Sequence, residues 1–313
     1  MEHEPVLVTE TVELLAPALD PGGTFVDATL GRAGHARAVL SAAPRARLVG
    51  IDRDPVALEE SRANLGELVD GARLVRGDFK EIASLLERLG DEEVRGVLLD
   101  LGVSSPQLDD PERGFGFRTE GPLDMRMDPD QRLSAADVVN NYSVPQLTSV
   151  IRRYGEERFA SRIARSIERA RPITTTTELA GIVKEAIPAA TRRTGPHPAR
   201  RTFQAIRIEV NGELTALESA LPAAVDALQP GGRVAVISYH SLEDRIVKRF
   251  FADQARGCTC PPEFPVCRCD AHARVRVLTR RPIRPPGDEL QHNPRASSAK
   301  LRAAERLMDE EAA

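Results

Sequence analysis

Three aspartates have the spacing of a ligand-binding edge, because each one comes at the end of a short apolar run. Asp52 ends "RLVGID", Asp78 follows "RLVRG" and Asp100 ends "VRGVLLD". The carboxyl ends of parallel strands meet at one edge of a sheet, so these side chains are expected to converge. Three carboxylates would repel a pyrophosphate, whereas they suit a ligand that carries ribose hydroxyls, an amino group and positive charge. The pattern therefore predicts a site for a cationic nucleoside.

A glycine pair lies upstream of these acids. "TLGRAGHA" contains Gly31 and Gly34, which is only half of the G-x-G-x-x-G dinucleotide fingerprint, and no Gly-Lys-Ser/Thr follows to make a P-loop. A tight structural turn would explain the pair equally well. Asp52 comes about 20 residues after Gly31, where an acid that binds ribose suits NAD and S-adenosylmethionine alike. The incomplete fingerprint disfavours NAD, so we expect the turn to hold the methionine part of S-adenosylmethionine, with backbone N–H groups at the helix start facing its carboxylate.

Other side chains follow the third and fourth apolar runs. Phe79 comes directly after Asp78, and the two could flank an adenine, although an isolated phenylalanine is more often a core residue. Polar residues that follow Asp100 are expected to converge on the same ligand, namely Ser104, Ser105 and Gln107.

The elements that must position these residues alternate between strands and helices. Strands are expected at 24–30, 46–54, 72–79, 94–103 and, after a long interval, 229–241, with helical periodicity at 34–43, 55–69 and 81–90 between them. Residues 107–132 have the Gly, Pro and charge density of a loop, and 134–190 are predicted to be helical, with a threonine cap before "ELAGIVKEAI". The fold class expected is α/β, Rossmann-like, with an inserted and mainly helical domain at 105–205 between the discontinuous parts 1–104 and 206–313.

Composition and charge limit the partners. The chain has 313 residues, 41% hydrophobic content and a net charge of −4, and it contains no run of 18 apolar residues. A cytoplasmic protein without a membrane partner is therefore expected. Two segments depart from the average: 191–208 carries five arginines and no carboxylate, and 271–306 is also rich in Lys and Arg. A solvated surface explains either segment, but such runs also bind nucleic acid phosphates.

Several long motifs resemble one known family. They are "HEPVLVTETVELL", "DATLGRAGH", "GIDRDP", "DLGVSSPQLDDPERGFGFRTEGPLDMRMD", "RTFQAIRIEVNGEL", "GGRVAVISYHSLEDRIVKRFF" and "NPRASSAKLRAAER". Together, from His3 to Arg306, they resemble the RsmH/MraW family of ribosomal RNA small-subunit methyltransferases. The resemblance implies a Rossmann-like, S-adenosylmethionine-dependent methyltransferase that acts on the N4 amine of one cytidine in the decoding region of 16S rRNA. The partner it implies is 16S rRNA in the small ribosomal subunit or a late assembly particle, and a homodimer stays open.

The family's cofactor contacts can be carried over to matching positions. They fall on Ala33, Gly34, His35, Asp52, Phe79, Asp100 and Gln107. Two positions depart from the family pattern. Ala33 stands where glycine is usual, and because alanine resists positive φ we expect a turn that is attainable without it. Ser297 stands where arginine is usual, which could remove one phosphate contact.

The chemistry expected is methyl transfer to an amine whose lone pair is delocalised into the ring. The enzyme's main task would be to hold nitrogen, methyl carbon and sulfur in line, with acceptors for the amine hydrogens. Asp100 and Ser105 are the candidate catalytic residues. Tyr239 or His240 could supply a face for base stacking or a proton acceptor, and ordinary packing at the end of a strand explains both equally well.

Binding of RNA is expected to use arginines, because reaching a cytidine in folded RNA requires an unstacked base and broad backbone contact. Arg200 and Arg201 are candidates, together with a cluster at Arg280, Arg281 and Arg284 and the tail "NPRASSAKLR". A methyltransferase with another substrate and a non-catalytic ribosome-binding factor remain as alternatives. The retained Asp52, Asp100 and Gln107 favour an active enzyme.

All four cysteines lie in "CTCPPEFPVCRC", at Cys258, Cys260, Cys267 and Cys269. Four thiolates in one short segment could hold a tetrahedral zinc, although the C-x-C pairs are tighter than the usual C-x-x-C. A metal-free loop is preferred, with a redox pair as the third alternative, so no metal site is assigned.

Overall fold

The computed structural model describes residues 5–90, 93–192, 197–257, 260 and 272–308, which divide into two compact units. The first unit comprises Met1–Gly102 and Thr215–Ala313, and the second comprises Val103–Leu214. The α/β, Rossmann-like class expected from the sequence is confirmed by the sheet of the first unit, and the interrupting segment is helical.

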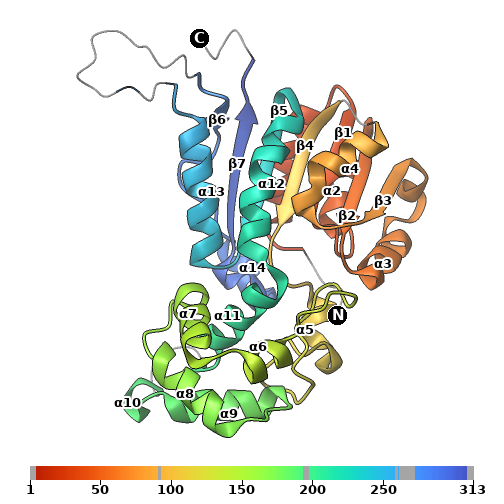
Figure 1. The fold of residues 1–313 in the computed structure, drawn as a ribbon. Helices are drawn as coiled ribbons and strands as arrows, with labels where there is room; N and C mark the ends of the chain where they lie inside the picture. The colour runs from red at the N-terminus through yellow and green to blue at the C-terminus, as the bar shows by residue number, and fades with distance from the viewer. Residues whose placement is uncertain (1–4, 91–92, 193–196, 258–259, 261–271, 309–313) are drawn as a thin grey trace. The chain divides into compact units, whose positions relative to one another are not determined.

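A seven-stranded sheet forms the first unit (Figure 1). Its strand order is β3-β2-β1-β4-β5-β7-β6; the first five strands in this order are parallel, and β7 is antiparallel to both β5 and β6. The order reverses between β1 and β4, which is where open α/β sheets bind ligands. The strands are β1 (Gly23–Asp27), β2 (Ala46–Asp52), β3 (Ala72–Arg76), β4 (Val94–Asp100), β5 (Leu228–Ser238), β6 (Val275–Val277) and β7 (Lys300–Arg306).

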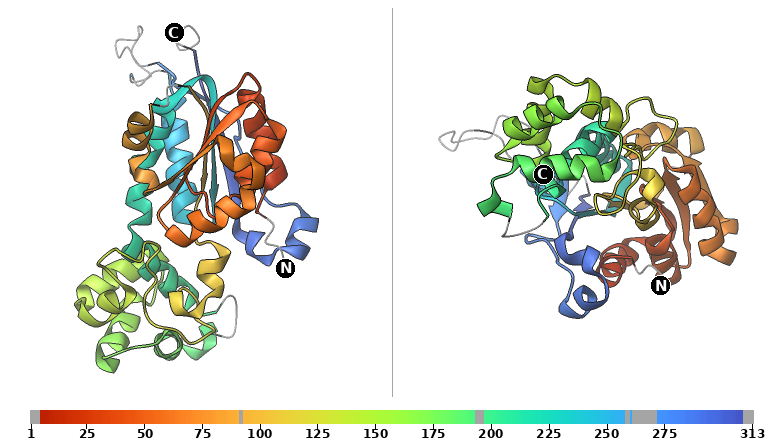
Figure 2. Two further views of the ribbon diagram at one scale, coloured as in Figure 1. Left: turned by 90° about the vertical axis from the view of Figure 1, so that its right-hand side faces the viewer. Right: turned by 90° about the horizontal axis from the view of Figure 1, so that it is seen from below.

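Helices cover both faces of this sheet (Figure 2). Successive side chains of a strand point to opposite faces, so Phe25 joins the apolar cluster with α1 and α2, whereas Val26 joins the cluster with α12 and α13. The helices of this unit are α1 (Val8–Leu19), α2 (Gly34–Ala42), α3 (Pro55–Leu65), α4 (Ile82–Leu89), α12 (Glu213–Ala227), α13 (Ser241–Gln254) and α14 (Gly287–His292), with 3₁₀ turns η1 (Gly66–Gly71), η2 (Phe79–Glu81) and η4 (Pro294–Ser298).

Strand β7 corrects one expectation, because its residues belong to the segment predicted to be a basic RNA-binding tail. Lys300 Nζ and Arg302 Nε lie 2.9 and 2.7 Å from the carboxylate oxygens of Asp244, on α13. Arg233 of β5 pairs with Glu305 at 2.9 Å. These ion pairs neutralise charged side chains beside the sheet, so a strand with little apolar periodicity can lie in its interior.

The second unit is built from helices around its own apolar core. Ile163 and Ile167 of α8 illustrate the pattern, since residues four apart share a helix face and both are fully buried. The threonine cap predicted for α9 is confirmed at Thr175, whose side chain accepts from Glu178 N. The elements are α5 (Ser105–Asp109), η3 (Pro111–Arg113), α6 (Ala135–Asn141), α7 (Val144–Gly155), α8 (Ala160–Ala170), α9 (Thr176–Ala186), α10 (Ala189–Arg192) and α11 (Arg200–Asn211).

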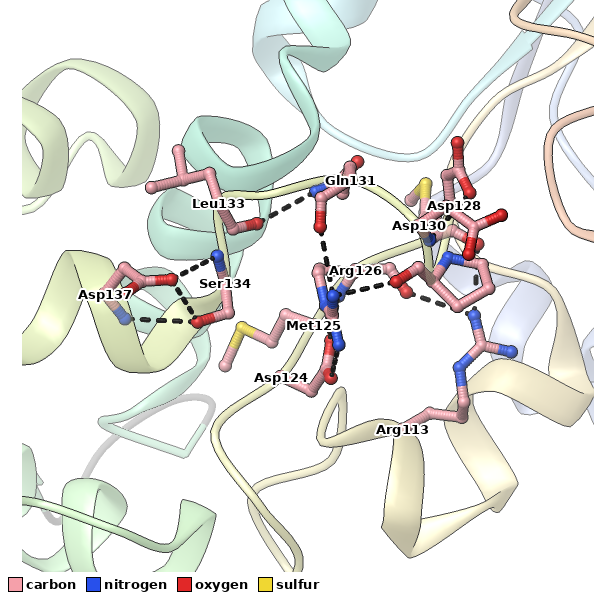
Figure 3. A network of polar contacts seen from close by, with 12 residues as sticks. Arg113, Asp124, Met125, Arg126, Asp128, Asp130, Gln131, Leu133, Ser134 and Asp137 are labelled. Carbon is pink, nitrogen blue, oxygen red and sulfur yellow. Dashed lines mark hydrogen bonds and ion pairs between the residues drawn. The ribbon is translucent and has the colours of Figure 1, made fainter.

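The long predicted loop is held by arginine (Figure 3). The Arg126 guanidinium donates two bonds to the Asp124 carboxylate, each 2.8 Å long, and further bonds to Pro129 O and Gln131 O. Arg113 donates to the carbonyls of Arg126 and Met127. Because these donors satisfy backbone carbonyls that no ladder or helix would satisfy, the segment keeps one conformation without regular structure.

The observed boundaries refine the predicted domain division. The first lies after Gly102, close to the expected position, but the second lies after Leu214. A boundary at 205/206 would cut α11, whose Asn211 side chain bonds to Met127 N and Met125 O inside the second unit. All of α11 therefore belongs with the inserted helices.

Candidate functional site

The reversal point of the sheet carries two carboxylates, at the ends of β1 and β4. Asp27 Oδ1 accepts from Thr29 N at 3.2 Å, and Thr29 Oγ1 accepts from Asp100 N at 2.6 Å. Asp27 is 1% exposed. The pKa of its carboxyl is raised to about 8, chiefly by burial. The bond from Thr29 N opposes this shift, and the nearby charges of Asp100 and Asp52 add to it. This edge therefore concentrates acidic groups.

Asp27 is a site residue that the sequence analysis missed. The motif "TFVDATL" predicts a strand, and its acid stands at the strand end, as Asp52 and Asp100 do. The same positional argument would have identified it.

Asp52 fixes the turn that follows β1. Its Oδ2 accepts from Gly31 N at 2.8 Å, and its Oδ1 accepts from Asp54 N at 2.9 Å. Burial raises the pKa of this carboxyl, while the two backbone bonds oppose the shift. A carboxylate has about four lone-pair sites, so both oxygens keep acceptor capacity for the hydroxyls of a ribose.

The start of α2 shows why the glycine pair stands where it does. A Cβ on Gly34 would lie 2.3 Å from Pro5 Cγ, so only glycine lets the N-terminal segment pack here. Ala33 adopts φ 59°, and the expectation that the turn avoids positive φ is wrong. Its methyl group is fully buried, and its N–H donates to Leu30 O at 2.7 Å. The turn therefore tolerates alanine at a conformational cost of about 1–2 kcal/mol, and the amides of Gly34 and His35 open the helix.

His35 joins the N-terminal segment to the end of β4. Its Nε2 lies 2.8 Å from Val6 O, and its Nδ1 lies 3.6 Å from Asp100 Oδ2. A carbonyl oxygen can only accept, so Nε2 carries a proton and donates to Val6 O. The imidazole is buried. His35 therefore holds the N-terminal segment at Val6, and its ring lies beside the Asp100 carboxylate.

Tyr239 and His240 follow β5. The Tyr239 hydroxyl donates to Asp100 Oδ1 at 2.9 Å. Burial, followed by the Asp100 charge, raises the pKa of Tyr239 well above its usual value, so the phenol stays protonated and acts as a donor. His240 caps α13, where its Nδ1 accepts from Glu243 N at 3.3 Å. The suggested role of proton acceptor therefore fits neither side chain as it stands.

Phe79 begins η2, which follows β3, and contributes to the core. Its ring is 8% exposed within the cluster beneath α4, and the Arg53 guanidinium lies 6.0 Å from the ring centroid. Asp78 accepts from Lys80 N and lies 3.3 and 3.8 Å from the cationic groups of Lys80 and Arg53. Asp78 is thus already balanced by two cations, unlike Asp27.

The remaining predicted residues belong to the second unit. The buried Gln107 side chain accepts from Ser104 N at 3.1 Å, which closes the first turn of α5. Ser105 begins α5, and its side chain lies outside the part that the structure describes. The structure therefore brings together Gly34, His35, Asp52 and Asp100 in the first unit, with Asp27 and Tyr239 added.

Metal-binding groups and membrane-spanning helices can be assessed only for the residues that the structure describes. Within the described ranges, no group of three or more His, Cys, Asp or Glu side chains could hold a metal ion. Cys258, Cys267 and Cys269 lie outside those ranges, so the cysteine segment stays untested. Across the residues described, none of the helices combines the length and apolar character needed to cross a bilayer.

The donor set fits S-adenosylmethionine. Three neighbouring strands end in carboxylates, and the pKa values of two of these, Asp27 and Asp52, are raised. A positively charged ligand at this edge would be attracted by the acids. The start of α2 offers backbone amides to an anionic group. A ligand with a sulfonium and amino group, ribose hydroxyls and a carboxylate matches both halves of this arrangement.

Comparison with known proteins agrees with this chemistry. The model of the MraW methylase family matches residues 1–307. Three relatives share the name ribosomal RNA small subunit methyltransferase H. The relative from Heliobacterium mobile is 51% identical, over 97% of this chain and 99% of its own length. The relative from Thermobifida fusca is 54% identical and the one from Acidothermus cellulolyticus 53% identical, each over 98% of this chain and 94% of its own length. The chain belongs to the MraW methylase family.

Proposed function

We propose that this protein is an S-adenosylmethionine-dependent methyltransferase that modifies the N4 amine of one cytidine in the decoding region of 16S rRNA. The observation that carries the proposal is the identity of about half of all residues, over nearly the full length, to enzymes named ribosomal RNA small subunit methyltransferase H. The acidic edge of the sheet supplies an independent chemical reason for the choice of cofactor.

Each part of the site has a separate task in this reaction. S-adenosylmethionine, when bound, supplies an electrophilic methyl group on a sulfonium. Asp52 accepts from the ribose hydroxyls, and the amides of Gly34 and His35 face the carboxylate of the methionine part. Asp100, which accepts a hydrogen bond from Tyr239, provides the acceptor for an amino group. Asp27 is a second acid near Asp100, and its charge depends on what is bound.

Ser105, Phe79 and Gln107 keep narrower proposed roles. Phe79 presents the rim of a mostly buried ring to the adenine. Ser105 and Gln107 open the inserted unit: Ser105 is a proposed catalytic residue together with Asp100, and Gln107 is a proposed cofactor contact, whose side chain accepts from Ser104 N. These assignments are supported by their matching positions in the family motifs.

The substrate proposed is the small ribosomal subunit or a late assembly particle, in the cytoplasm, with a homodimer as an open alternative. Arg200 and Arg201, together with Arg280, Arg281 and Arg284, are exposed and remain the proposed RNA contacts from the sequence. Arg201 is partly engaged, since its guanidinium lies 3.9 Å from Glu157 and bonds to Glu156 O. Lys300 and Arg302 are withdrawn from this set because they pair with Asp244.

A transfer assay separates this function from its alternatives. Purified protein is incubated with S-adenosylmethionine carrying a tritiated methyl group and with small subunits, large subunits or bulk protein from cells that lack this chain. Label in the small-subunit RNA alone supports the proposal. Label in protein would favour a methyltransferase with another substrate, and cofactor binding without any transfer would favour a non-catalytic factor.

A further inference from the structure

Six arginines of the second unit lie on two neighbouring helices and the link between them, outside the acidic site. Arg152 and Arg153 lie in the last turn of α7, and Arg158 lies in the link to α8. Arg162, Arg165 and Arg169 follow along α8. All six are exposed. Helices α7 and α8 pack against each other, and α7 also packs against α11 (Figure 1). We call these six residues the arginine surface.

The three arginines on α8 form one stripe. Arg162, Arg165 and Arg169 stand at i, i+3 and i+7, which is a single face of a helix, opposite the buried Ile163 and Ile167. Seven residues of helix rise about 10 Å. The stripe therefore presents guanidinium groups along a line rather than at a point, as a polyanion requires.

The arginine surface is not neutralised by ion pairs with carboxylates of the described residues. Within the described part of the chain, no carboxylate lies within 4 Å of these six guanidinium groups, whereas Arg126, Arg207, Arg233 and Arg302 elsewhere each pair with one. Among the acids of this segment, Glu168 is exposed on α8, between Arg165 and Arg169 in sequence. Glu157 is buried, and its carboxylate accepts a hydrogen bond from Phe159 N, just before α8 begins.

Aromatic rings and hydroxyls hold several of these guanidinium groups in place. The Arg158 guanidinium lies 4.7 Å from the Phe159 ring centroid, and the Arg153 guanidinium lies 5.2 Å from that of Tyr154. Arg152 donates to Ser161 Oγ. Such contacts orient the charge while most of its five N–H donors stay free for phosphate oxygens.

From this placement we infer that the arginine surface binds the phosphate backbone of the RNA substrate. The inference rests on the proposed function for the identity of the RNA. Its own basis is the stripe of exposed arginines on α8, together with Arg153 and Arg158, whose guanidinium groups lie over aromatic rings. The backbone contact positions the substrate without reading its sequence. Release of counterions makes this kind of binding strongly dependent on salt.

Charge reversal on α8 tests the surface. The variant R162E/R165E is compared with R62E/R88E, which makes the same charge change at exposed arginines of α3 and α4 in the first unit. For R162E/R165E we expect KM for small subunits to rise on the order of tenfold, with the slope of log affinity against log salt reduced by about 2. The kcat at saturating subunits and the affinity for S-adenosylmethionine should stay unchanged. The neutral variant R162Q/R165Q should show a smaller rise in KM and a smaller reduction of the salt slope.

The possible results distinguish a failure of the arginine-surface inference from a failure of the proposed function. Equal KM values and salt slopes for R162E/R165E and R62E/R88E, with methylation intact, would overturn the arginine surface and leave the proposed function standing. Loss of subunit affinity with unchanged binding to naked 16S rRNA would also overturn it, because the partner would then be a ribosomal protein. If the wild-type chain methylates nothing, filter binding of naked 16S rRNA by the same three variants still decides the inference.

Discussion

Replacing Asp27 by asparagine should remove a large part of the pH dependence of stability. In the folded chain its carboxyl has a pKa of about 8, against an ordinary value of 3.8. Between these two pH values the folded state holds a proton that the unfolded state has released. The free energy of unfolding therefore falls as pH rises through this window, by about 1.4 kcal/mol per pH unit for one such group.

The amide introduced by D27N would keep the carbonyl acceptor for Thr29 N and carry no ionisable proton. The free energy of unfolding of D27N, minus that of the wild type, should therefore increase with pH. The expected increase is roughly 3 kcal/mol between pH 5 and pH 7. Because Asp100 and Asp52 also raise the pKa of Asp27, their own titration spreads the change over a wider range than for an isolated group.

Urea unfolding of the cofactor-free protein at pH 5, 6, 7 and 8 measures this difference. The chain contains no tryptophan, so circular dichroism is the suitable signal. The matched control is D20N, since the Asp20 side chain is 82% exposed. Its difference from wild type should stay nearly constant with pH. Parallel pH curves for D27N and wild type would refute the assignment of a buried, protonated Asp27.

Three further substitutions test the geometry of the site. Gly34→Ala should lower the free energy of unfolding in urea by about 1–3 kcal/mol, because the added Cβ displaces the N-terminal segment. The control is Gly181→Ala, in open space on α9, which should be neutral or stabilising. An equal change in the free energy of unfolding for both variants would contradict the packing argument. Tyr239→Phe should weaken S-adenosylmethionine binding in calorimetry by about tenfold, since a bond to a charged acceptor is lost; Tyr142→Phe, which removes a comparable hydroxyl–carboxylate bond from the second unit, should leave that affinity unchanged. Asp52→Asn should raise the same dissociation constant by about 10–100-fold, and an unchanged value would exclude Asp52 as the ribose acceptor.

The strand-end site was predictable because its signal is local. Asp52 and Asp100 each end an apolar run, and the βα alternation fixes which edge of the sheet they share. Asp27 has the same local signal, at the end of a shorter run. Its raised pKa could not be foreseen, because it depends on burial and on charges brought close by the fold.

Strand β7 was not predictable in the same way. Its sequence "KLRAAER" lacks the apolar run expected of an interior strand. Its charged side chains are accommodated by Asp244 and Arg233, which lie on other elements far away in sequence. The positive φ of Ala33 is a similar case, because its cost is met by the packing of the N-terminal segment around the turn.

Nucleoside mass spectrometry would show which base of the small-subunit RNA this protein methylates. Small subunits from cells that lack this protein are incubated with the purified enzyme and S-adenosylmethionine carrying a labelled methyl group, and the 16S rRNA is then digested and mapped. We expect label on N4 of a single cytidine near the decoding centre. Label on another base, or none in RNA while the protein still binds the cofactor, would contradict it.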